Sequence, residues 1–254
     1  MNRLNAIENI RKKLSNNKVT IGSWIHLADS SVAEIMGNSG YDWVAVDQEH
    51  GSISFHQLPD IFRSLELGET LPLVRLSQGH PKDCKQALDA GAGGVIIPNV
   101  ENSKKLELII DACKWPPAGN RGVGFSRANL FGRNFKEYFD EAQKPLIVAM
   151  IESVEAIDNL DQILKVKGLD AILIGPYDLS ASMNITGEFE KEIFLSAIDK
   201  IRSLAIENSV AYGIHIVEPA VENLKNRIED GYQFIAYSID SVFLSKVCEN
   251  PIKS

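Results

Sequence analysis

The chain alternates between short apolar runs and amphipathic segments, with one such pair about every 30 residues, a spacing typical of β/α units. The apolar runs are nearly continuous, as expected of parallel strands buried on both faces. Eight predicted strands follow this pattern: Thr20–His26, Trp43–Asp47, Pro72–Leu76, Gly94–Pro98, Leu146–Ile151, Ala171–Gly175, Ala211–Ile216 and Phe234–Ser238. The predicted helices are Ser31–Ser39, Phe55–Leu67, Lys82–Ala90, Ser103–Cys113, Val154–Val166, Glu188–Asn208, Pro219–Asp230 and Ser241–Glu249.

Eight β/α units in 254 residues predict a TIM (β/α)8 barrel, whose usual size is about 250 residues. A doubly wound open sheet is the alternative. It is less favoured because the first strand is not followed by a glycine-rich phosphate turn. No linker interrupts the pattern, so we expect residues 1–254 to form one domain.

One connection is unusually long. Residues 114–144 separate the fourth predicted helix from the fifth strand and include Trp115-Pro116-Pro117, Gly119, Gly122 and Gly124. Such long stretches are uncommon in compact domains unless they are functional or ordered by a partner. We therefore expect a functional loop or one held by a neighbouring subunit.

The composition excludes several classes of function. The net charge of −8 disfavours a nucleic-acid or anionic membrane surface, and no apolar run approaches a membrane span. Residues 1–5 lack the pattern of an export signal. Cys84, Cys113 and Cys248 are far apart and have no CxxC spacing, which indicates reduced thiols rather than disulfides or a zinc site. These features together predict a cytoplasmic protein with no nucleic-acid or membrane partner.

In a barrel of this type, catalytic residues lie at the C-terminal ends of the strands. The second predicted strand ends in Asp47-Gln48-Glu49-His50-Gly51. His50 is flanked by two carboxylates there, and imidazole is the side chain best suited to move protons near neutral pH. The alternative is a helix-entry loop whose acids cap backbone N–H groups.

Arg75 lies near the end of the third predicted strand, among apolar residues. A guanidinium is costly to bury unless it meets an anion. Arg75 is therefore a candidate to bind a substrate carboxylate or a developing oxyanion. A structural ion pair with an acid of the second strand is equally compatible with the sequence.

Two acids follow neighbouring strands: Glu152 after the fifth and Asp178 after the sixth. Hard oxygen ligands suit Mg²⁺ or Mn²⁺, which share their coordination with water and substrate. The alternative is that Asp178 caps the next helix and Glu152 pairs with a base.

Other candidates are weaker. His26 and His215 lie near strand ends but are lone polar residues, which are more often packed than ligating. Residues 119–124 are glycine-rich without the spacing of a nucleotide-binding loop. No lysine lies within the predicted strands, which disfavours a Schiff-base aldolase.

Taken in order, these segments resemble the class II, metal-dependent pyruvate aldolases of the HpcH/HpaI family over nearly the whole chain. The matching segments are Gly40-Tyr41-Asp42-Trp43, Asp47-Gln48-Glu49-His50-Gly51, Leu73-Val74-Arg75, Leu88-Asp89-Ala90-Gly91-Ala92, Ile96-Ile97-Pro98, Pro116-Pro117, Arg121-Gly122-Val123-Gly124, Ile151-Glu152 and Ile174-Gly175-Pro176-Tyr177-Asp178-Leu179-Ser180. The resemblance implies a carbon–carbon lyase that cleaves a 4-hydroxy-2-oxo acid into pyruvate and an aldehyde.

The resemblance also implies a cofactor and a set of roles. A divalent metal (Mg²⁺, Mn²⁺ or Co²⁺) is expected, with no organic cofactor. Glu152 and Asp178 would hold the metal, His50 would act as the base, Arg75 would stabilise charge on the keto oxygen, and Asp89 would raise the basicity of His50. The backbone at Gly175, Pro176 and Tyr177, flanked by Met150, would receive the substrate carboxylate, while Asp47 and Glu49 would hold metal-bound waters.

Two positions depart from the family pattern. Met150 stands where many members have Gln, and Tyr177 stands where a small residue is common. These departures leave the aldehyde partner open. The family also implies a homohexamer, a trimer of dimers, with the last helix exchanged between subunits. Residues 242–244 and Val247 give this helix an apolar face, although ordinary packing on its own barrel would also use it.

Two other functions fit the sequence less well. A citramalyl- or malyl-CoA-type lyase would need a basic patch for the CoA phosphates, and none is evident. A non-catalytic barrel that binds an oxo acid is the remaining alternative.

Overall fold

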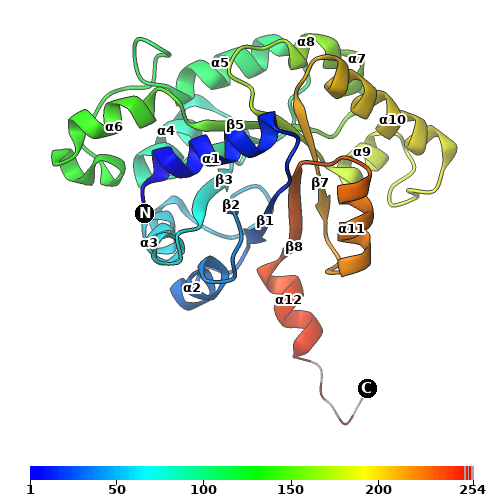
Figure 1. Cartoon of the computed structure of the whole chain (residues 1–254), viewed down its shortest axis with the longest axis horizontal. Coiled ribbons are helices and arrows are strands. Elements are labelled where there is room, and N and C mark those ends of the chain that lie inside the picture. The colour runs from blue at the N-terminus through cyan, green and yellow to red at the C-terminus, as the bar shows by residue number, and fades with distance from the viewer. Residues whose placement is uncertain (249, 251, 253–254) are drawn as a thin grey trace.

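Eight parallel strands close into a barrel in the computed structural model, which describes residues 1–248, 250 and 252 (Figure 1). Each strand pairs with its neighbours in sequence, and β8 returns to pair with β1. The predicted TIM (β/α)8 fold is therefore confirmed. The strands are β1 Thr20–Ile25, β2 Trp43–Asp47, β3 Leu71–Arg75, β4 Gly94–Ile97, β5 Leu146–Ile151, β6 Ala171–Ile174, β7 Ala211–Ile216 and β8 Phe234–Ile239.

The strands carry two apolar layers because successive side chains point to opposite faces. One cluster fills the inside of the barrel, and a larger cluster lies between the strands and the surrounding helices. Inside, Trp43 stacks on Phe234 with ring centroids 4.3 Å apart. Gly22 makes room for this pair, since a Cβ there would lie 2.1 Å from the Trp43 indole.

Most helices that cover the barrel begin close to the residues predicted from the sequence, and two differ. The predicted helix 154–166 is divided at Asn159 into two short helices, and the predicted helix 188–208 begins at Glu192. The end of the last predicted helix, Glu249, lies outside the described residues. The covering helices are α2 Ser30–Gly37, α3 Leu58–Leu67, α4 Pro81–Ala90, α5 Ser103–Cys113, α7 Val154–Asp158, α8 Leu160–Leu164, α10 Glu192–Glu207, α11 Val221–Glu229 and α12 Asp240–Val247.

The structure has further helices outside the predicted ones: α1 Arg3–Ser15, α6 Phe135–Ala142 and α9 Pro176–Ser182, with a 3₁₀ turn η2 Arg127–Gly132. The first residues of the predicted helix 55–67 form a 3₁₀ turn, η1 Phe55–Gln57, ahead of α3. Helix α1 packs Ile7, Ile10 and Leu14 onto the apolar cluster inside the barrel. Their spacing of three and four residues marks one helix face. Helix α1 therefore closes the N-terminal end of the barrel, away from the strand ends that carry the candidate site.

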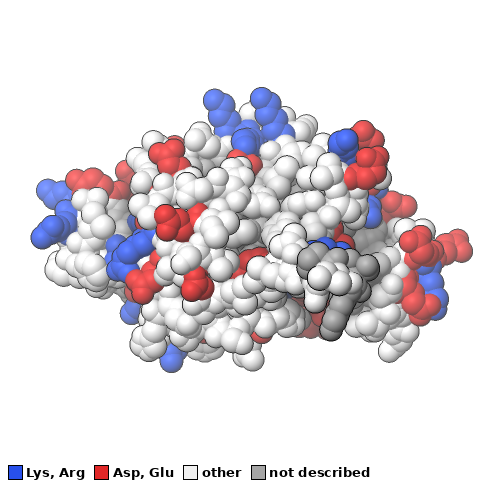
Figure 2. Space-filling view, turned by 90° about the horizontal axis from the view of Figure 1, so that it is seen from below, with Lys and Arg blue, Asp and Glu red and all other residues white. Residues whose placement is uncertain are grey.

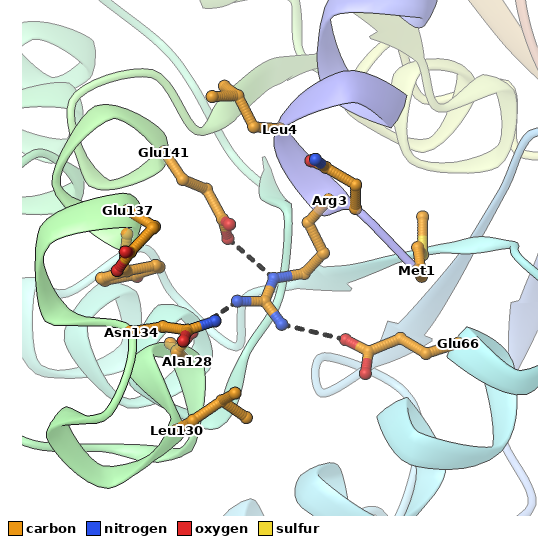
Figure 3. Close-up of a pocket in the computed structure, with 11 residues that line it drawn as sticks. Met1, Arg3, Leu4, Glu66, Ala128, Leu130, Asn134, Glu137 and Glu141 are labelled. Atoms are coloured by element: carbon orange, nitrogen blue, oxygen red, sulfur yellow. Dashed lines mark hydrogen bonds and ion pairs between the residues drawn. The ribbon is translucent and has the colours of Figure 1, made fainter.

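The long connection 114–144 is ordered by contacts within the chain. Arg3 of α1 donates to Glu141 of α6, to Glu66 of α3 and to the carbonyl of Ala128 (Figure 3). These residues line a cavity of about 320 Å³ beside α1. Because Arg3 satisfies several acceptors from three segments at once, it joins α1, α3 and the connection into one layer.

Helix α12 projects away from the barrel instead of lying along it (Figure 1). Its closest neighbours are the ends of β1 and β8. On the face shown in Figure 2, Lys and Arg lie mainly toward the edges, while Asp and Glu are scattered among uncharged residues across the middle. Among the described helices, none is both long and apolar enough to cross a membrane.

Candidate active site

Asp47 is the buried centre of a polar cluster at the C-terminal end of the barrel. It ends β2 and lies beside Arg75, which ends β3, in the register of the two strands. Arg75 donates to both carboxylate oxygens, with Nε 2.8 Å from Oδ1 and Nη2 2.5 Å from Oδ2. His26 Nε2 lies 2.7 Å from Oδ2. Burial alone would raise the pKa of Asp47, but the His26 and Arg75 contacts hold that pKa well below its ordinary value.

The same carboxylate shapes the turn that follows β2. Its Oδ1 accepts the backbone N–H groups of Glu49 and His50 at 3.0 and 3.3 Å. Gly51 is required here, because a Cβ would lie 2.2 Å from the carbonyl oxygen of Asp47. The alternative that an acid of this loop caps backbone N–H groups therefore holds for Asp47. The His50 side chain is exposed and borders the barrel mouth.

Arg75 has contacts beyond Asp47. Its Nη1 lies 3.1 Å from Glu49 Oε2 and 3.9 Å from Met150 Sδ. Its guanidinium carbon lies 4.8 Å from the centroid of a Trp24 ring, within cation–π range. The structural ion pair that the sequence left open is thus present. The pair also fixes the guanidinium so that Nη1 faces Glu49 and Met150.

Glu152 follows β5 directly and is only 4% exposed. Its Oε1 accepts the backbone N–H of Asn99 at 2.5 Å, whereas its buried Oε2 has no hydrogen-bond partner within the described part of the chain. Burial raises the pKa of Glu152 to about 7, and the charges of Glu49 and Asp178 add to this effect. Oε2 is therefore positioned for a ligand that supplies positive charge or a proton.

Asn99 links the buried Glu152 to the partly buried Glu49, and the sequence analysis does not name it. It lies after β4 with a φ of +52°, a left-handed conformation that asparagine tolerates better than most residues. Its side chain donates to Glu49 Oε1 at 3.1 Å, and its backbone donates to Glu152. An Asn directly after the strand-ending Pro98 was the available signal.

Asp178 lies in the first turn of α9, which begins directly after Gly175. Its carboxylate is exposed, yet its charge contributes to the raised pKa values of Glu49 and Glu152. A Cβ at position 175 would lie 2.9 Å from Glu152 Oε2, so glycine leaves room beside that oxygen. The half-exposed Tyr177 ring contacts Phe189 edge-on, with centroids 5.0 Å apart.

Two histidines that the sequence reasoning ranked low belong to this cluster. His26 binds Asp47, and the backbone N–H groups of His26 and Leu27 donate to Asp240 at 2.9 Å. His215 at the end of β7 lies 5.6 Å from the Trp24 ring, centroid to centroid. Neither could be assigned from spacing alone, because their partners come from other strands and from α12.

The family model described as HpcH/HpaI aldolase/citrate lyase matches residues 20–247. The chain belongs to this family.

Several HpcH/HpaI relatives cover nearly the whole chain. Hydroxypyruvate/pyruvate aldolase of Roseobacter denitrificans is 33% identical over 94% of this chain and 93% of its own length. A 4-hydroxy-2-oxo-heptane-1,7-dioate aldolase of Escherichia coli is 34% identical over 90% of this chain and 87% of its own length. The solved structure of an HpcH/HpaI aldolase from Desulfitobacterium hafniense superposes with a TM-score of 0.87 at 30% identity, covering 95% of this chain and 94% of that one.

Most residues that the HpcH/HpaI resemblance singled out lie at one end of the barrel. One exception is Asp89, in the last turn of α4. Because barrel helices run antiparallel to the strands, this turn lies toward the N-terminal end, opposite His50. The residues that lie at or just after the C-terminal ends of the strands are Asp47, Glu49, His50, Arg75, Met150, Glu152, Gly175, Pro176, Tyr177 and Asp178.

Asp89 instead faces the long connection. Its Oδ1 lies 3.5 Å from Nη1 of the buried Arg121, which also donates to the Tyr138 hydroxyl at 2.9 Å. Burial raises the pKa of Asp89, and the nearby charges of Arg121 and Lys85 oppose that effect. The expected contact with His50 is therefore not made within a single chain, because α4 directs Asp89 to the other end of the barrel.

Proposed function

We propose that this protein is an aldolase that reversibly cleaves a 4-hydroxy-2-oxo acid into pyruvate and an aldehyde. The observation that carries the proposal is the buried Oε2 of Glu152, which has no hydrogen-bond partner among the described residues and lies in one cluster with Asp178, Arg75 and Glu49 at the barrel mouth. The names of the relatives, among them 4-hydroxy-2-oxovalerate aldolase of Novosphingobium aromaticivorans, support this substrate class.

The cluster suits a divalent cation. No three or more His, Cys, Asp or Glu side chains already surround one point among the described residues. Mg²⁺, however, is usually held by only one or two carboxylates, with water and substrate completing the shell. Glu152, with its unpartnered Oε2 beside Gly175, and Asp178 fit that donor set. Bound Mg²⁺, Mn²⁺ or Co²⁺ would draw charge from the keto oxygen as the pyruvate enolate forms.

Cleavage also requires a base for the C4 hydroxyl. His50 is the exposed imidazole at the rim, and its backbone is fixed by Asp47. We propose that it takes the hydroxyl proton, directly or through one water, as the C3–C4 bond breaks. The electron pair of that bond moves into the pyruvate enolate, whose oxygen charge Arg75 stabilises.

The remaining residues bind and orient. Both oxygens of Asp47 are occupied by Arg75 and His26, with two backbone N–H groups on Oδ1. We therefore propose that Asp47 holds Arg75 in place instead of binding the metal-bound waters that the resemblance implies. Glu49 keeps the role of binding those waters. The substrate carboxylate would lie against the backbone of Gly175, Pro176 and Tyr177, where first-turn N–H groups of α9 have no helical partner.

A direct assay tests this function. Purified protein is incubated with 4-hydroxy-2-oxovalerate or 4-hydroxy-2-oxo-heptane-1,7-dioate, and pyruvate release is followed with and without EDTA. We expect turnover that EDTA abolishes and that Mg²⁺, Mn²⁺ or Co²⁺ restores, and expect Glu152→Gln to be inactive while the exposed Glu155→Gln matches wild type. Full activity in EDTA would overturn the metal proposal. Absence of pyruvate from every 4-hydroxy-2-oxo acid would overturn the aldolase assignment.

We also propose that the protein assembles through α12 as a homohexamer built from dimers. In an ordinary barrel, the helix after β8 covers the outer face between β8 and β1. Here α12 projects outward, Leu244 is 50% and Val247 80% exposed, and Ile21 of β1 and Tyr237 of β8 remain only partly buried. A partner's α12 would cover the apolar surface that each chain leaves open.

A further inference from the structure

His215 carries a polar atom that the proposed mechanism does not use. It lies opposite Ala236 in the register of β7 and β8, and Ala236 belongs to the apolar cluster inside the barrel. The imidazole therefore points inward, consistent with its contact with the Trp24 ring. Its Nε2 is buried and has no hydrogen-bond partner in the described part of the chain.

The ring is neutral and keeps a lone pair. Burial and the charge of Arg75 lower the pKa of His215 to about 3, although a hydrogen bond with the Ser238 backbone acts in the opposite direction. Since Nε2 has no partner, we assign the single ring hydrogen to Nδ1; the Ser238 backbone contact, which raises the pKa, is one with an acceptor. The other nitrogen then needs a donor, and an unmet buried acceptor is costly.

Among the described residues, no neighbouring side chain supplies that donor. The Arg75 guanidinium is directed to Asp47, Glu49 and Met150, and His26 is directed to Asp47. His215 as a whole is only partly buried, so its ring borders the mouth from which a ligand enters. The partner of Nε2 therefore has to arrive with the bound molecule or as water.

We propose that His215 is a specificity residue that accepts a hydrogen bond from a hydroxyl group on the substrate. A keto oxygen or carboxylate has no hydrogen to offer, whereas a hydroxyl has. The inference rests on the proposed aldolase function and narrows its substrates to those that carry a hydroxyl in addition to the one on C4. The hydroxyl has two chemical sources, either C3 of a 3-hydroxy-2-oxo acid or the carbon next to the carbonyl of a hydroxyaldehyde.

Aldol addition with four reactant pairs separates these sources. Pyruvate or hydroxypyruvate is combined with acetaldehyde or glycolaldehyde, and kcat/KM is measured for each pair with added Mg²⁺ or Mn²⁺. We expect wild type to favour one hydroxylated reactant by about tenfold or more, as sites that bind a hydroxyl discriminate against analogues without it. Preference for hydroxypyruvate assigns the hydroxyl to the oxo acid, and preference for glycolaldehyde assigns it to the aldehyde.

Variants then test the residue itself. His215→Leu should lose the preference while keeping turnover of the unhydroxylated pair, and His215→Gln, whose amide oxygen is an acceptor, should restore part of it. His56→Leu, at an exposed histidine of η1, is the matched control and should keep the preference. Melting temperatures verify that each variant is folded.

Three outcomes would overturn the inference while leaving the aldolase function standing: no preference in wild type, an unchanged preference in His215→Leu, or an equal loss on all four pairs. The last would indicate a structural role or a contact with the C4 hydroxyl common to every aldol. No turnover of any pair by metal-loaded wild type would overturn the proposed function and this inference together.

Discussion

Replacing Asp47 by Asn tests whether the buried Asp47–Arg75 pair organises the barrel mouth. The substitution keeps the size of the side chain but removes the charge that Arg75 and His26 contact. Arg75 is 7% exposed and Asp47 fully buried, so water cannot replace the lost partner. The buried guanidinium would then keep only the ion pair between Nη1 and Glu49.

The expected cost follows from this geometry. Removing one partner of a buried ion pair costs about 3–5 kcal/mol, and we take about 3 kcal/mol because Asn retains one acceptor oxygen. For a domain of this size, 1 kcal/mol changes the melting temperature by about 2–4 °C, so Asp47→Asn should melt about 6–12 °C below wild type. The control Asp161→Asn removes an exposed carboxylate paired with Lys165 on α8 and should leave the melting temperature unchanged.

The effect should also depend on pH. The pKa of Asp47 is lower in the folded protein than in the unfolded chain, so its ionised form stabilises the fold above the unfolded pKa of about 4. That contribution is lost as the pH falls toward the folded pKa. Differential scanning calorimetry from pH 8 to pH 3 should therefore show a constant difference between wild type and variant above pH 5 and a smaller one below pH 4. A variant that melts with wild type at pH 7 would refute the reasoning.

Three further perturbations address separate parts of the site. Burial raises the pKa of Glu152 to about 7, so ionisation of Glu152 destabilises the metal-free fold as the pH rises from about 4.5 through 7. In EDTA, the Glu152→Gln variant should therefore be more stable than wild type by about 3 kcal/mol at pH 8 and equally stable near pH 4.5. A variant with a lower melting temperature than wild type at pH 8 would contradict this. His50→Ala should reduce kcat about 100-fold or more in the pyruvate-release assay while His56→Ala does not, and equal rates for the two would remove His50 from the mechanism. Leu244→Asp should dissociate the assembly in light scattering, whereas a wild-type monomer would refute the proposed α12 exchange.

Within one chain, Asp89 lies at the opposite end of the barrel from His50. The segment around it matches the family pattern, but α4 carries it to the N-terminal end of the barrel and pairs it with Arg121. The predicted helix 82–90 has Asp89 at its C-terminal end, which in a barrel lies opposite the strand ends that carry His50. A contact between Asp89 and His50 would therefore have to form between two chains. If the Asp89→Asn variant, purified as the intact oligomer, has the kcat of wild type, Asp89 has no catalytic contact with His50.

The helices outside the repeating pattern illustrate a related limit. Helix α1 has the apolar spacing of an amphipathic helix, yet it precedes the first β/α unit and was not read as one. Helix α6 lies inside a connection marked by prolines and glycines, and its Tyr138 is ordered by Arg121. Local spacing was sufficient for the repeated units, where each helix has an adjacent strand to cover. It was insufficient where the partner surface is distant in sequence.

The amino-acid sequence by itself determined the barrel and the set of residues at its mouth. Alternating apolar runs require parallel strands covered by helices, and the C-terminal ends of such strands meet at one place however far apart they are in the chain. Glu49, His50, Arg75, Glu152 and Asp178 could be named on that basis. Only the tertiary structure decided which of these groups bind each other, and that His26, Asn99 and His215 join them. Those contacts require the side chains to lie within a few ångströms of one another. Strand register and side-chain direction set these distances, and the periodic pattern of apolar residues in the sequence does not encode them.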